Sequence, residues 1–370
     1  LNPSDSTITD DSRIRAVIPT IQYLLDHKAK VILCSHLGRP KGAPDDKLRM
    51  APVGEHLCKI LGRPVLTTKD CIGEEASKGI SSLKEGEVLL LENLRFHPGE
   101  VSNDPEFAKA LASLGEIYIN DAFGAAHRAH ASVVGVTQHL PAVAGLLMEK
   151  ELKFLSTALN SPARPWAAII GGAKISDKIA VMEHLLKRVD ALLIGGGMAA
   201  TFLKAQGKEV GCSLIEEGKI DASIELMDEA REKGLPLLLP ADVVVAEDFR
   251  ADAPHKGVPV EQIPPNWYIM DIGEGTVALF EKQLRGCKTA IWNGPMGVFE
   301  FSPFSKGTRR LAEILATLDA TTIVGGGSTA EAVRDLGLTD KMSHVSTGGG
   351  ASLEFLEGKV LPGVAALPDV

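Results

Sequence analysis

Short runs of apolar, mostly β-branched residues alternate with amphipathic stretches along the whole chain. In stretches such as 14–25 the apolar residues recur every three or four positions, which is typical of a helix with one buried face. Buried strands that alternate with helices predict α/β domains with parallel sheets, in three layers of helix, sheet and helix. We expect strands at 30–34, 87–91, 116–119, 167–170, 191–194, 237–239, 289–292, 322–324 and 343–345.

The length of the chain, 370 residues, exceeds what one ordinary hydrophobic core supports, so we expect two domains. The stretch 148–162 is charged, has helical spacing and ends in Asn160-Ser161-Pro162. We interpret it as a helix that connects an N-terminal domain, 1–147, to a C-terminal domain, 163–354. The polar, proline-rich stretch 248–265 is typical of a surface excursion rather than of a domain boundary.

The composition narrows the class of protein. Hydrophobic residues make up 45% of the chain, yet no uninterrupted apolar run approaches the roughly 20 residues of a membrane span. With 39 basic and 48 acidic residues, the net charge of −9 argues against nucleic-acid or anionic-membrane partners, so any anion site must be local. The five cysteines are scattered and form no C-x-x-C pair, so we expect neither a disulfide framework nor a zinc site. The first residues lack a secretory pattern. Together these features predict that the protein is located in a reducing cytoplasm.

Several predicted strands in the second half end in glycines, at 171–172, 195–197, 325–327 and 348–350. Parallel strands deliver their carboxyl ends to one edge of the sheet, so these turns should share a rim. Glycine lets backbone amides approach an anion, and a helix N-terminus adds partial positive charge. Tight packing without a ligand would explain one such turn, whereas the set predicts a polyphosphate site.

Two further patterns bear on this rim. In "GGAKISDK", Lys174 and Lys178 are four positions apart at a predicted helix start, where they would either meet phosphate groups or form a solvated pair. The turn "IWNGPMGVFEF" places Glu300 where it would accept hydrogen bonds from ribose hydroxyls, or be merely exposed. "IVGGGSTA" also fits a loose dinucleotide fingerprint, but position 345 is Val where that fingerprint needs an acid about 20 residues on.

The first half carries basic residues just past its predicted strands and at one helix start. Guanidinium groups match phosphate and carboxylate in paired geometry, so this set predicts a site for a small, highly anionic substrate. Each arginine alone would more often form a surface salt bridge. The H-x-x-H spacing of His127 and His130 leaves a metal interpretation open, but without a nearby Cys or further His ligands it favours anion binding or helix capping. The residues concerned are Arg13, His36, Arg39, Arg95, His127, Arg128 and His130.

The motifs "SHLGRP", "LENLRFH", "NDAFGAAHRAHAS", "GGAKISDK", "IWNGPMGVFEF" and "STGGGASLEFLEGKVLPG" stand in the order and at the spacing of the phosphoglycerate kinase family, which the whole chain resembles. The resemblance implies two Rossmann-like domains joined by a hinge helix, with the tail from about 355 to 370 packed on the first domain. It implies reversible phosphoryl transfer between 1,3-bisphosphoglycerate and ADP, giving 3-phosphoglycerate and ATP, by a cytoplasmic monomer that uses Mg²⁺ with the nucleotide and closes about its hinge.

The resemblance also assigns roles to residues of this sequence. It implies that the transferred phosphoryl group is stabilised by Arg13, Lys174, Gly349 and Gly350. It places phosphoglycerate against Arg13, Ser35, His36, Leu37, Gly38, Arg39, Arg95, His127 and Arg128. It places the nucleotide against Gly172, Lys174, Lys178, Gly196, Gly197, Asn293, Pro295, Val298, Glu300, Gly326, Gly327, Ser328 and Thr329.

The chain departs from the family pattern in two places. The family's first strand ends in an Asp-x-Asn pair that contacts phosphoglycerate, and this sequence begins at or after that pair, so that strand is expected to be missing and Asn2 has no secure counterpart. Ser328 stands where the family usually has an aspartate that helps to hold magnesium. The second departure keeps open an alternative to the kinase, a catalytically silent nucleotide-binding scaffold, beside the weaker dehydrogenase interpretation.

Overall fold

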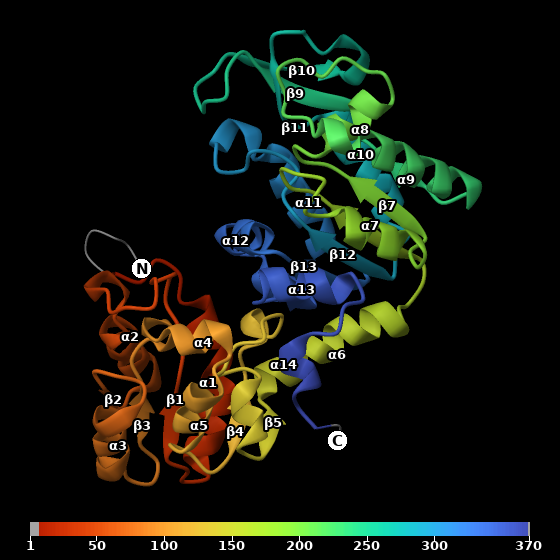
Figure 1. Cartoon of the computed structure of the whole chain (residues 1–370). Coiled ribbons are helices and arrows are strands. Elements are labelled where there is room, and N and C mark those ends of the chain that lie inside the picture. The colour runs from red at the N-terminus through yellow and green to blue at the C-terminus, as the bar shows by residue number, and fades with distance from the viewer. Residues whose placement is uncertain (1–6, 369–370) are drawn as a thin grey trace. The chain divides into compact units, whose positions relative to one another are not determined.

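The computed structural model describes residues 7–368, so Asn2 lies outside the described residues. The chain forms two compact units (Figure 1). Unit 1 contains the described residues up to Leu152 together with 360–368, and unit 2 contains Lys153–Lys359. The helix α6, Leu146–Asn160, contains the point at which the chain passes from one unit to the other. The expected division at 148–162 falls on this helix.

Unit 1 is built around short parallel strands, as the apolar runs predict. Strand β3 lies between β1 and β2, with Val88 opposite both Val31 and Val65, and β4 pairs with β5. One face of α1 buries Ile21 and Leu25 against this sheet. The strands are β1 (Val31–Leu33), β2 (Val65–Thr67), β3 (Val88–Leu90), β4 (Tyr118–Asn120) and β5 (Ala142–Ala144). The helices are α1 (Ser12–Asp26), α2 (Ala51–Leu61), α3 (Gly73–Ser82), α4 (Pro98–Ser102), α5 (Pro105–Ala112) and α14 (Pro362–Ala365).

Unit 2 contains a larger parallel sheet in the order β14-β13-β12-β6-β7-β8. Every residue of the central strands β6 and β12 is buried, which explains why their sequences are continuous apolar runs. The strands are β6 (Trp166–Ile170), β7 (Ala191–Ile194), β8 (Leu237–Leu238), β12 (Thr289–Asn293), β13 (Thr321–Gly325) and β14 (His344–Val345). The helices are α7 (Ile179–Leu186), α8 (Ala199–Ala205), α9 (Ile220–Glu232), α10 (Glu274–Leu284), α11 (Lys306–Ala316), α12 (Gly327–Asp335) and α13 (Gly349–Leu356).

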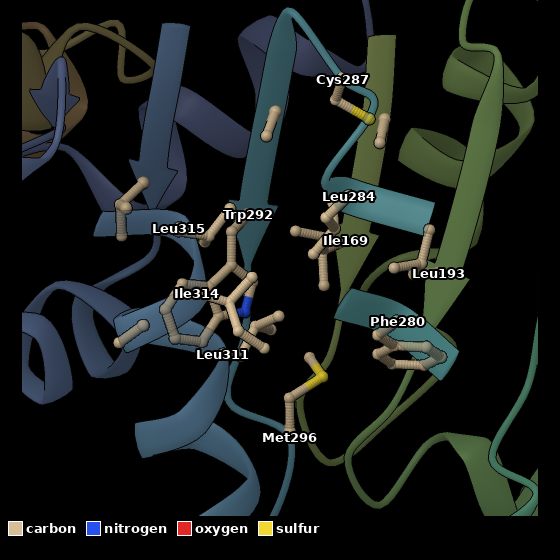
Figure 2. Packing of buried hydrophobic residues seen from close by; sticks show 14 of the residues in the cluster. Ile169, Leu193, Phe280, Leu284, Cys287, Trp292, Met296, Leu311, Ile314 and Leu315 are labelled. Carbon is tan, nitrogen blue, oxygen red and sulfur yellow. The ribbon is translucent and has the colours of Figure 1, made fainter. Parts of the chain in front are cut away.

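The core of unit 2 fixes this sheet against α10 and α11. Figure 2 shows Trp292 of β12 beside Leu311, Ile314 and Leu315 of α11, all of them buried. Phe280 of α10 and Ile169 of β6 belong to the same cluster. Burial of this kind contributes roughly 1.5–3 kcal/mol for each large apolar side chain. The strand ends that follow this core are thereby held in place.

The predicted strands are all present, and the expected fold class of two α/β units with parallel sheets is confirmed. The stretch 248–265 lies inside unit 2, in agreement with its interpretation as a surface excursion rather than a boundary, but it contains a strand that was not predicted. Strands β9 (Asp242–Ala246), β10 (His255–Pro259) and β11 (Tyr268–Ile272) form an antiparallel sheet in the order β10-β9-β11. In β10 only Val258 is buried, because the strand lies at an edge, and its polar sequence therefore concealed it.

Two further strands, β2 and β5, were not predicted. Both are short and largely exposed, with burial limited mainly to Val65 at the start of β2 and Ala142 at the start of β5. Such strands carry too little apolar pattern to distinguish them from loops. Within the part of the chain that the structure describes, no helix combines the length and apolar character needed to cross a membrane.

Candidate active site

The basic residues of unit 1 gather around the segments that follow β1, β3 and β4. We call Ser35, His36, Leu37, Gly38, Arg39, Arg95, His127 and Arg128 the basic rim. Burial, together with the nearby positive charges of Arg95 and Arg128, lowers the pKa of His36 from 6.5 to about 4. Arg39 also lies close enough to Arg95 to affect its pKa. The structure therefore brings these side chains together, as the strand-end argument predicts, and leaves His36 neutral at pH 7.

The position of Arg95 is fixed by main-chain contacts. Its side chain is buried, and its Nη1 donates a 2.8 Å hydrogen bond to the carbonyl oxygen of Gly38. The Asn93 amide group donates to the carbonyls of Leu37, at 2.8 Å, and Leu48, at 2.9 Å. Asn93 thus joins the segment after β1 to the segment after β3. Sequence reasoning assigned Asn93 no role, because its partners lie far along the chain.

The glycine at position 38 is required by its surroundings. Gly38 has φ +64°, and a Cβ atom added to it would lie 2.6 Å from Cδ2 of Leu48. Because this φ lies in the left-handed region, a larger residue there would be strained, and its Cβ would push the Leu48 side chain aside. Glycine at position 38 therefore allows the left-handed backbone conformation of this segment, which the sequence alone did not reveal.

The two histidines of the H-x-x-H motif face different partners. Nε2 of His127 accepts a 3.2 Å hydrogen bond from Nε of Arg128. His130 is buried, with its Nδ1 3.6 Å from a carboxylate oxygen of Glu100. This arrangement favours anion binding and local structure over the metal interpretation of the motif. Arg13 is exposed in the first turn of α1, as its helix-start position predicts.

The glycine turns of unit 2 meet at the carboxyl edge of its parallel sheet. The amide of Gly172 donates to the carbonyl of Pro295, at 3.0 Å, and that of Gly196 to the carbonyl of Met296, also at 3.0 Å. The amide of Gly294 donates at 2.7 Å to Oγ1 of Thr329. The turns after β6, β7, β12 and β13 are thus in direct contact. We call this set, with the starts of α12 and α13, the glycine rim.

Glycine serves two purposes in this rim. At Gly196, with φ +70°, an added Cβ would lie 2.6 Å from the Gly172 nitrogen, so these turns need glycine to pack together. Since the amides of Gly172 and Gly196 already donate to carbonyls, they shape the rim without facing an anion. At Gly349 an added Cβ would lie 3.0 Å from the Gly327 nitrogen, so α12 and α13 begin side by side. First-turn amides have no acceptor within their own helix, so this pair of helix starts suits a phosphate.

The expected helix start at Lys174 is wrong, because α7 begins at Ile179. Residues 174–178 form turns anchored by Ile175, which is buried and whose carbonyl accepts from the amides of Lys178 and Ile179. Lys174 is exposed. Lys178 is half-buried, its Nζ donates to Oδ1 of Asn293, and burial lowers its pKa from 10.5 to about 8. Both lysines thus precede the helix, and only Lys178 is built into the rim.

The turn after β12 has an apolar side and an exposed acid. Asn293 is buried at the end of the strand, Pro295 and Val298 are half-buried, and Glu300 is exposed. Val298 packs against a cluster that includes Phe304, and its amide donates to the carbonyl of Met270 at 2.8 Å. The predicted distribution of apolar surface and carboxylate is present in this turn.

A buried acid behind this turn was missed. Asp271 of β11 is 2% exposed and accepts hydrogen bonds from the amides of Gly307, at 2.8 Å, and Ile272, at 2.9 Å. A Cβ added to Gly297 would lie 2.3 Å from its Oδ1, so the carboxylate lies directly against the turn. Burial raises its pKa from 3.8 to about 7. An acid inside the apolar run "YIMDI" was the available sequence signal.

Asp70, Cys71 and His97 of unit 1 offer ligand atoms within 4.8 Å of one another. Nε2 of His97 lies 2.6 Å from Oδ1 of Asp70, closer than the about 3.3 Å that separates two ligands of a tetrahedral zinc ion. Burial also raises the pKa of the Cys71 thiol. We interpret the group as a hydrogen-bonded pair beside a buried thiol.

Comparison with known proteins shows to which family the chain is similar. Residues 2–359 match the phosphoglycerate kinase family. The chain is 56% identical over 362 residues to a phosphoglycerate kinase of Moorella thermoacetica, covering 98% of this chain and 92% of the relative. It is 58% identical over 366 residues to the phosphoglycerate kinase of Synechococcus elongatus, and this alignment covers 98% of this chain and 91% of the relative.

Solved structures agree with the sequence relatives. The structure of phosphoglycerate kinase from Coxiella burnetii is similar with a TM-score of 0.86 at 43% identity, covering 98% of this chain and 92% of that one. The phosphoglycerate kinase of Pyrococcus horikoshii is similar with a TM-score of 0.88 at 33% identity and the same coverage. The similarity therefore extends over nearly the whole chain in both sequence and fold.

Proposed function

The chain belongs to the phosphoglycerate kinase family, and on that premise we propose that its basic rim binds the phosphoglycerate while its glycine rim binds the nucleotide. The enzyme transfers a phosphoryl group reversibly between 1,3-bisphosphoglycerate and ADP, giving 3-phosphoglycerate and ATP. The observation that supports the division of labour is the presence of two chemically different rims, one in each unit. One is rich in guanidinium groups, and the other in glycine turns and helix starts.

On the phosphoglycerate side, the arginines supply the charge. Arg39, Arg95 and Arg128 carry guanidinium groups that pair with phosphate and carboxylate oxygens. His36 contributes hydrogen bonding without charge, because its pKa of about 4 leaves the ring neutral at pH 7. The rest of the proposed contact set is Arg13, Ser35, Leu37, Gly38 and His127.

On the nucleotide side, the starts of α12 and α13 and the two lysines receive the phosphate groups. Lys178 lies against Asn293, and Lys174 is exposed just before it in the chain, free to reach a transferring group. Glu300 accepts hydrogen bonds from the ribose hydroxyls, and Pro295 and Val298 offer apolar surface to the base. The remaining proposed contacts are Gly197, Gly326, Gly327, Ser328 and Thr329, together with Gly172 and Gly196, whose amides donate to carbonyls and not to the nucleotide.

The chemical step exchanges one P–O bond for another. In the direction of ATP formation, a terminal phosphate oxygen of ADP attacks phosphorus, and the bond from phosphorus to the acyl oxygen breaks, leaving the carboxylate of 3-phosphoglycerate. Such a transfer needs positioning and charge stabilisation more than proton transfer. We assign the stabilisation of the moving group to Arg13, Lys174 and the amides of Gly349 and Gly350. Because each substrate binds its own unit, a hinge motion at α6 has to bring them together and exclude water.

Magnesium enters this proposal with the nucleotide. The oxygen donor that the chain offers at the start of α12 is the exposed hydroxyl of Ser328, which is neutral. Mg²⁺ favours oxygen ligands and keeps several waters when substrate phosphates supply the rest, so a hydroxyl fits as a weak or water-mediated ligand. The ion would neutralise charge on the transferring phosphates.

We also propose a monomer that acts in the cytoplasm without nucleic-acid or membrane partners. A net charge of −9 does not favour polyanionic surfaces, and all five cysteines are free thiols, which suits a reducing compartment.

A coupled assay tests the function directly. The full-length enzyme is expected to phosphorylate 3-phosphoglycerate with ATP and magnesium, and a magnesium titration reports on the metal. Absence of turnover in a folded protein that still binds ATP would support the scaffold alternative. Detectable NADH binding would revive the dehydrogenase alternative.

A further inference from the structure

Glu100 is a buried acid within the most basic part of unit 1. It belongs to α4, and only 1% of its surface is exposed. Its negative charge is close enough to Arg95 and His36 to oppose the lowering of the pKa of both groups by burial. A carboxylate so near a site for an anionic substrate opposes that substrate electrostatically. Its presence there needs another explanation.

The contacts of the Glu100 side chain supply one, since they join it to the short segment 130–132. Its Oε1 accepts a 2.7 Å hydrogen bond from the hydroxyl of Ser132, and its Oε2 accepts a 3.0 Å bond from the Ser132 amide. Its main-chain carbonyl accepts a 2.9 Å bond from the amide of Ala131. Nδ1 of His130 lies 3.6 Å from Oε1. One residue thus holds three consecutive residues in place.

The clamped segment directly follows two residues of the basic rim. His127 and Arg128 precede it, and the amides of Val133 and Val134 both donate to the carbonyl of His130, which closes a tight turn. Because these bonds close the segment 130–134 into a turn, we infer that a shift at Ser132 is passed along the chain to Arg128. On its other side, Glu100 follows the Arg95 segment, to which its amide is joined by a 3.2 Å bond to the carbonyl of His97.

We propose that Glu100 is a positioning residue of the basic rim, which ties the segment carrying Arg95 to the segment carrying Arg128 and so sets their spacing for phosphoglycerate. This inference rests on the proposed binding of phosphoglycerate at the basic rim. The Ser132 contacts are buried, and hydrogen bonds to a charged group are stronger than those between neutral groups, so they hold this segment in place.

The charge of Glu100 and its clamping contacts have opposite effects on phosphoglycerate affinity, so they are separable by experiment. If Glu100 acted only as a charge, its removal would strengthen binding of an anion. If it positions the arginines, its removal weakens binding, because paired guanidinium recognition depends on their spacing. Nucleotide affinity serves as an internal reference, since the glycine rim belongs to unit 2.

The test compares Glu100→Ala and Glu100→Gln with wild type, with Glu106→Ala as the control at an exposed acid of α5. We expect Glu100→Ala to raise the KM for 3-phosphoglycerate by about tenfold or more, with the KM for ATP within about twofold of wild type. Glu100→Gln keeps an oxygen that accepts from the Ser132 amide, so its KM is expected to lie between the two. An unchanged or lower KM for 3-phosphoglycerate in Glu100→Ala overturns the proposal.

Two further variants keep the outcome decisive. Arg39→Ala is measured alongside: if it raises the KM for 3-phosphoglycerate while Glu100→Ala does not, the positioning role fails and the basic rim stands. If neither variant changes that KM, the assignment of the basic rim fails as well. Should Glu100→Ala not fold, Ser132→Ala removes only the hydroxyl contact and is expected to raise the same KM by about threefold. No change in that variant overturns the proposal.

Discussion

The ammonium group of Lys178 donates a hydrogen bond to the amide oxygen of Asn293 at the carboxyl end of β12. This contact draws the lysine into the protein, and burial lowers its pKa to about 8. In mild alkali Lys178 is therefore only partly protonated, so it offers less positive charge to the phosphate of the proposed nucleotide. Asp177 and Glu357 act in the opposite direction and favour the charged form.

A pH-dependent nucleotide affinity follows from this contact. Because Lys178 loses its proton as the pH rises through about 8, we expect the KM for ATP to increase between pH 7 and pH 9. Lys178→Arg keeps its charge throughout this range and should abolish the increase. Steady-state kinetics at saturating 3-phosphoglycerate measure the effect. An equal rise in both proteins would assign the pH dependence to another group.

Lys178 should also lower the stability of unit 2. Its pKa is about 8 in the folded chain and 10.5 in the unfolded chain, so the unfolded chain binds more protons between these values. Stability due to this group therefore increases as the pH rises from 8 to 10.5, and the charged lysine is unfavourable at pH 7. We expect Lys178→Met to raise the Tm at pH 7 while weakening ATP binding by about tenfold or more. Calorimetry and nucleotide titration measure the two effects, and a lower Tm would contradict the argument.

Lys174 should matter for turnover and not for stability. Its side chain is exposed, so Lys174→Ala is expected to change the free energy of unfolding by less than about 0.5 kcal/mol. Loss of a charge that stabilises the transferring group should lower kcat roughly 100-fold. Lys282→Ala is the matched control, because Lys282 is exposed near the end of α10, just before β12 begins. Near-wild-type kcat in Lys174→Ala would reject its assigned role.

The buried strands of both units were predictable, and the edge strands were not. In β6 every residue is buried, so its sequence is an apolar run that needs no context to interpret. In β10 only Val258 is buried, and the remaining residues are exposed at the edge of the sheet, so they show no apolar pattern. The gathering of the rims was predictable for the same reason as the buried strands, since parallel strands deliver their carboxyl ends to a common edge.

The residues that hold the rims in place were not predictable, because their partners are distant in sequence. Asn93 contacts Leu48, Glu100 contacts Ser132, and Asp271 contacts Gly307. Each is a polar residue whose burial is decided by tertiary packing, and periodicity carries no information about it. The start of α7 was misplaced for a related reason, since buried Ile175 anchors a turn where the pattern favoured a helix.

Asp271 should make unit 2 less stable at neutral pH than in mild acid. Its pKa is about 7 in the folded chain and 3.8 in the unfolded chain, so the folded chain binds more protons between these values. Stability due to this group is therefore present in full below pH 4 and is lost as the pH rises to 7. We expect the wild type to lose on the order of 2–4 kcal/mol relative to Asp271→Asn over this range.

Denaturant unfolding followed by tryptophan fluorescence measures this loss selectively, because Trp166, Trp267 and Trp292, the three tryptophans of the chain, all belong to unit 2. Both proteins are compared at pH 4.5 and pH 8. Asp271→Asn also loses a hydrogen-bond acceptor for the amides of Gly307 and Ile272, which shifts its stability at every pH. Only the change with pH tests the carboxylate, and a difference that is constant with pH would contradict the prediction.

The proposed contact with magnesium at the start of α12 is tested at Ser328. Its hydroxyl is exposed in the first turn of that helix, where a carboxylate would be favoured by the helix dipole and would offer the metal a charged oxygen. We expect Ser328→Asp to lower the magnesium concentration needed for half-maximal turnover by about threefold or more, with the fold unchanged. Ser328→Asn has a similar shape without the charge and should leave this concentration near the wild-type value. A magnesium titration at fixed ATP separates the outcomes: no change in Ser328→Asp, or a loss of activity at all magnesium concentrations, would show that the metal is not held near this position.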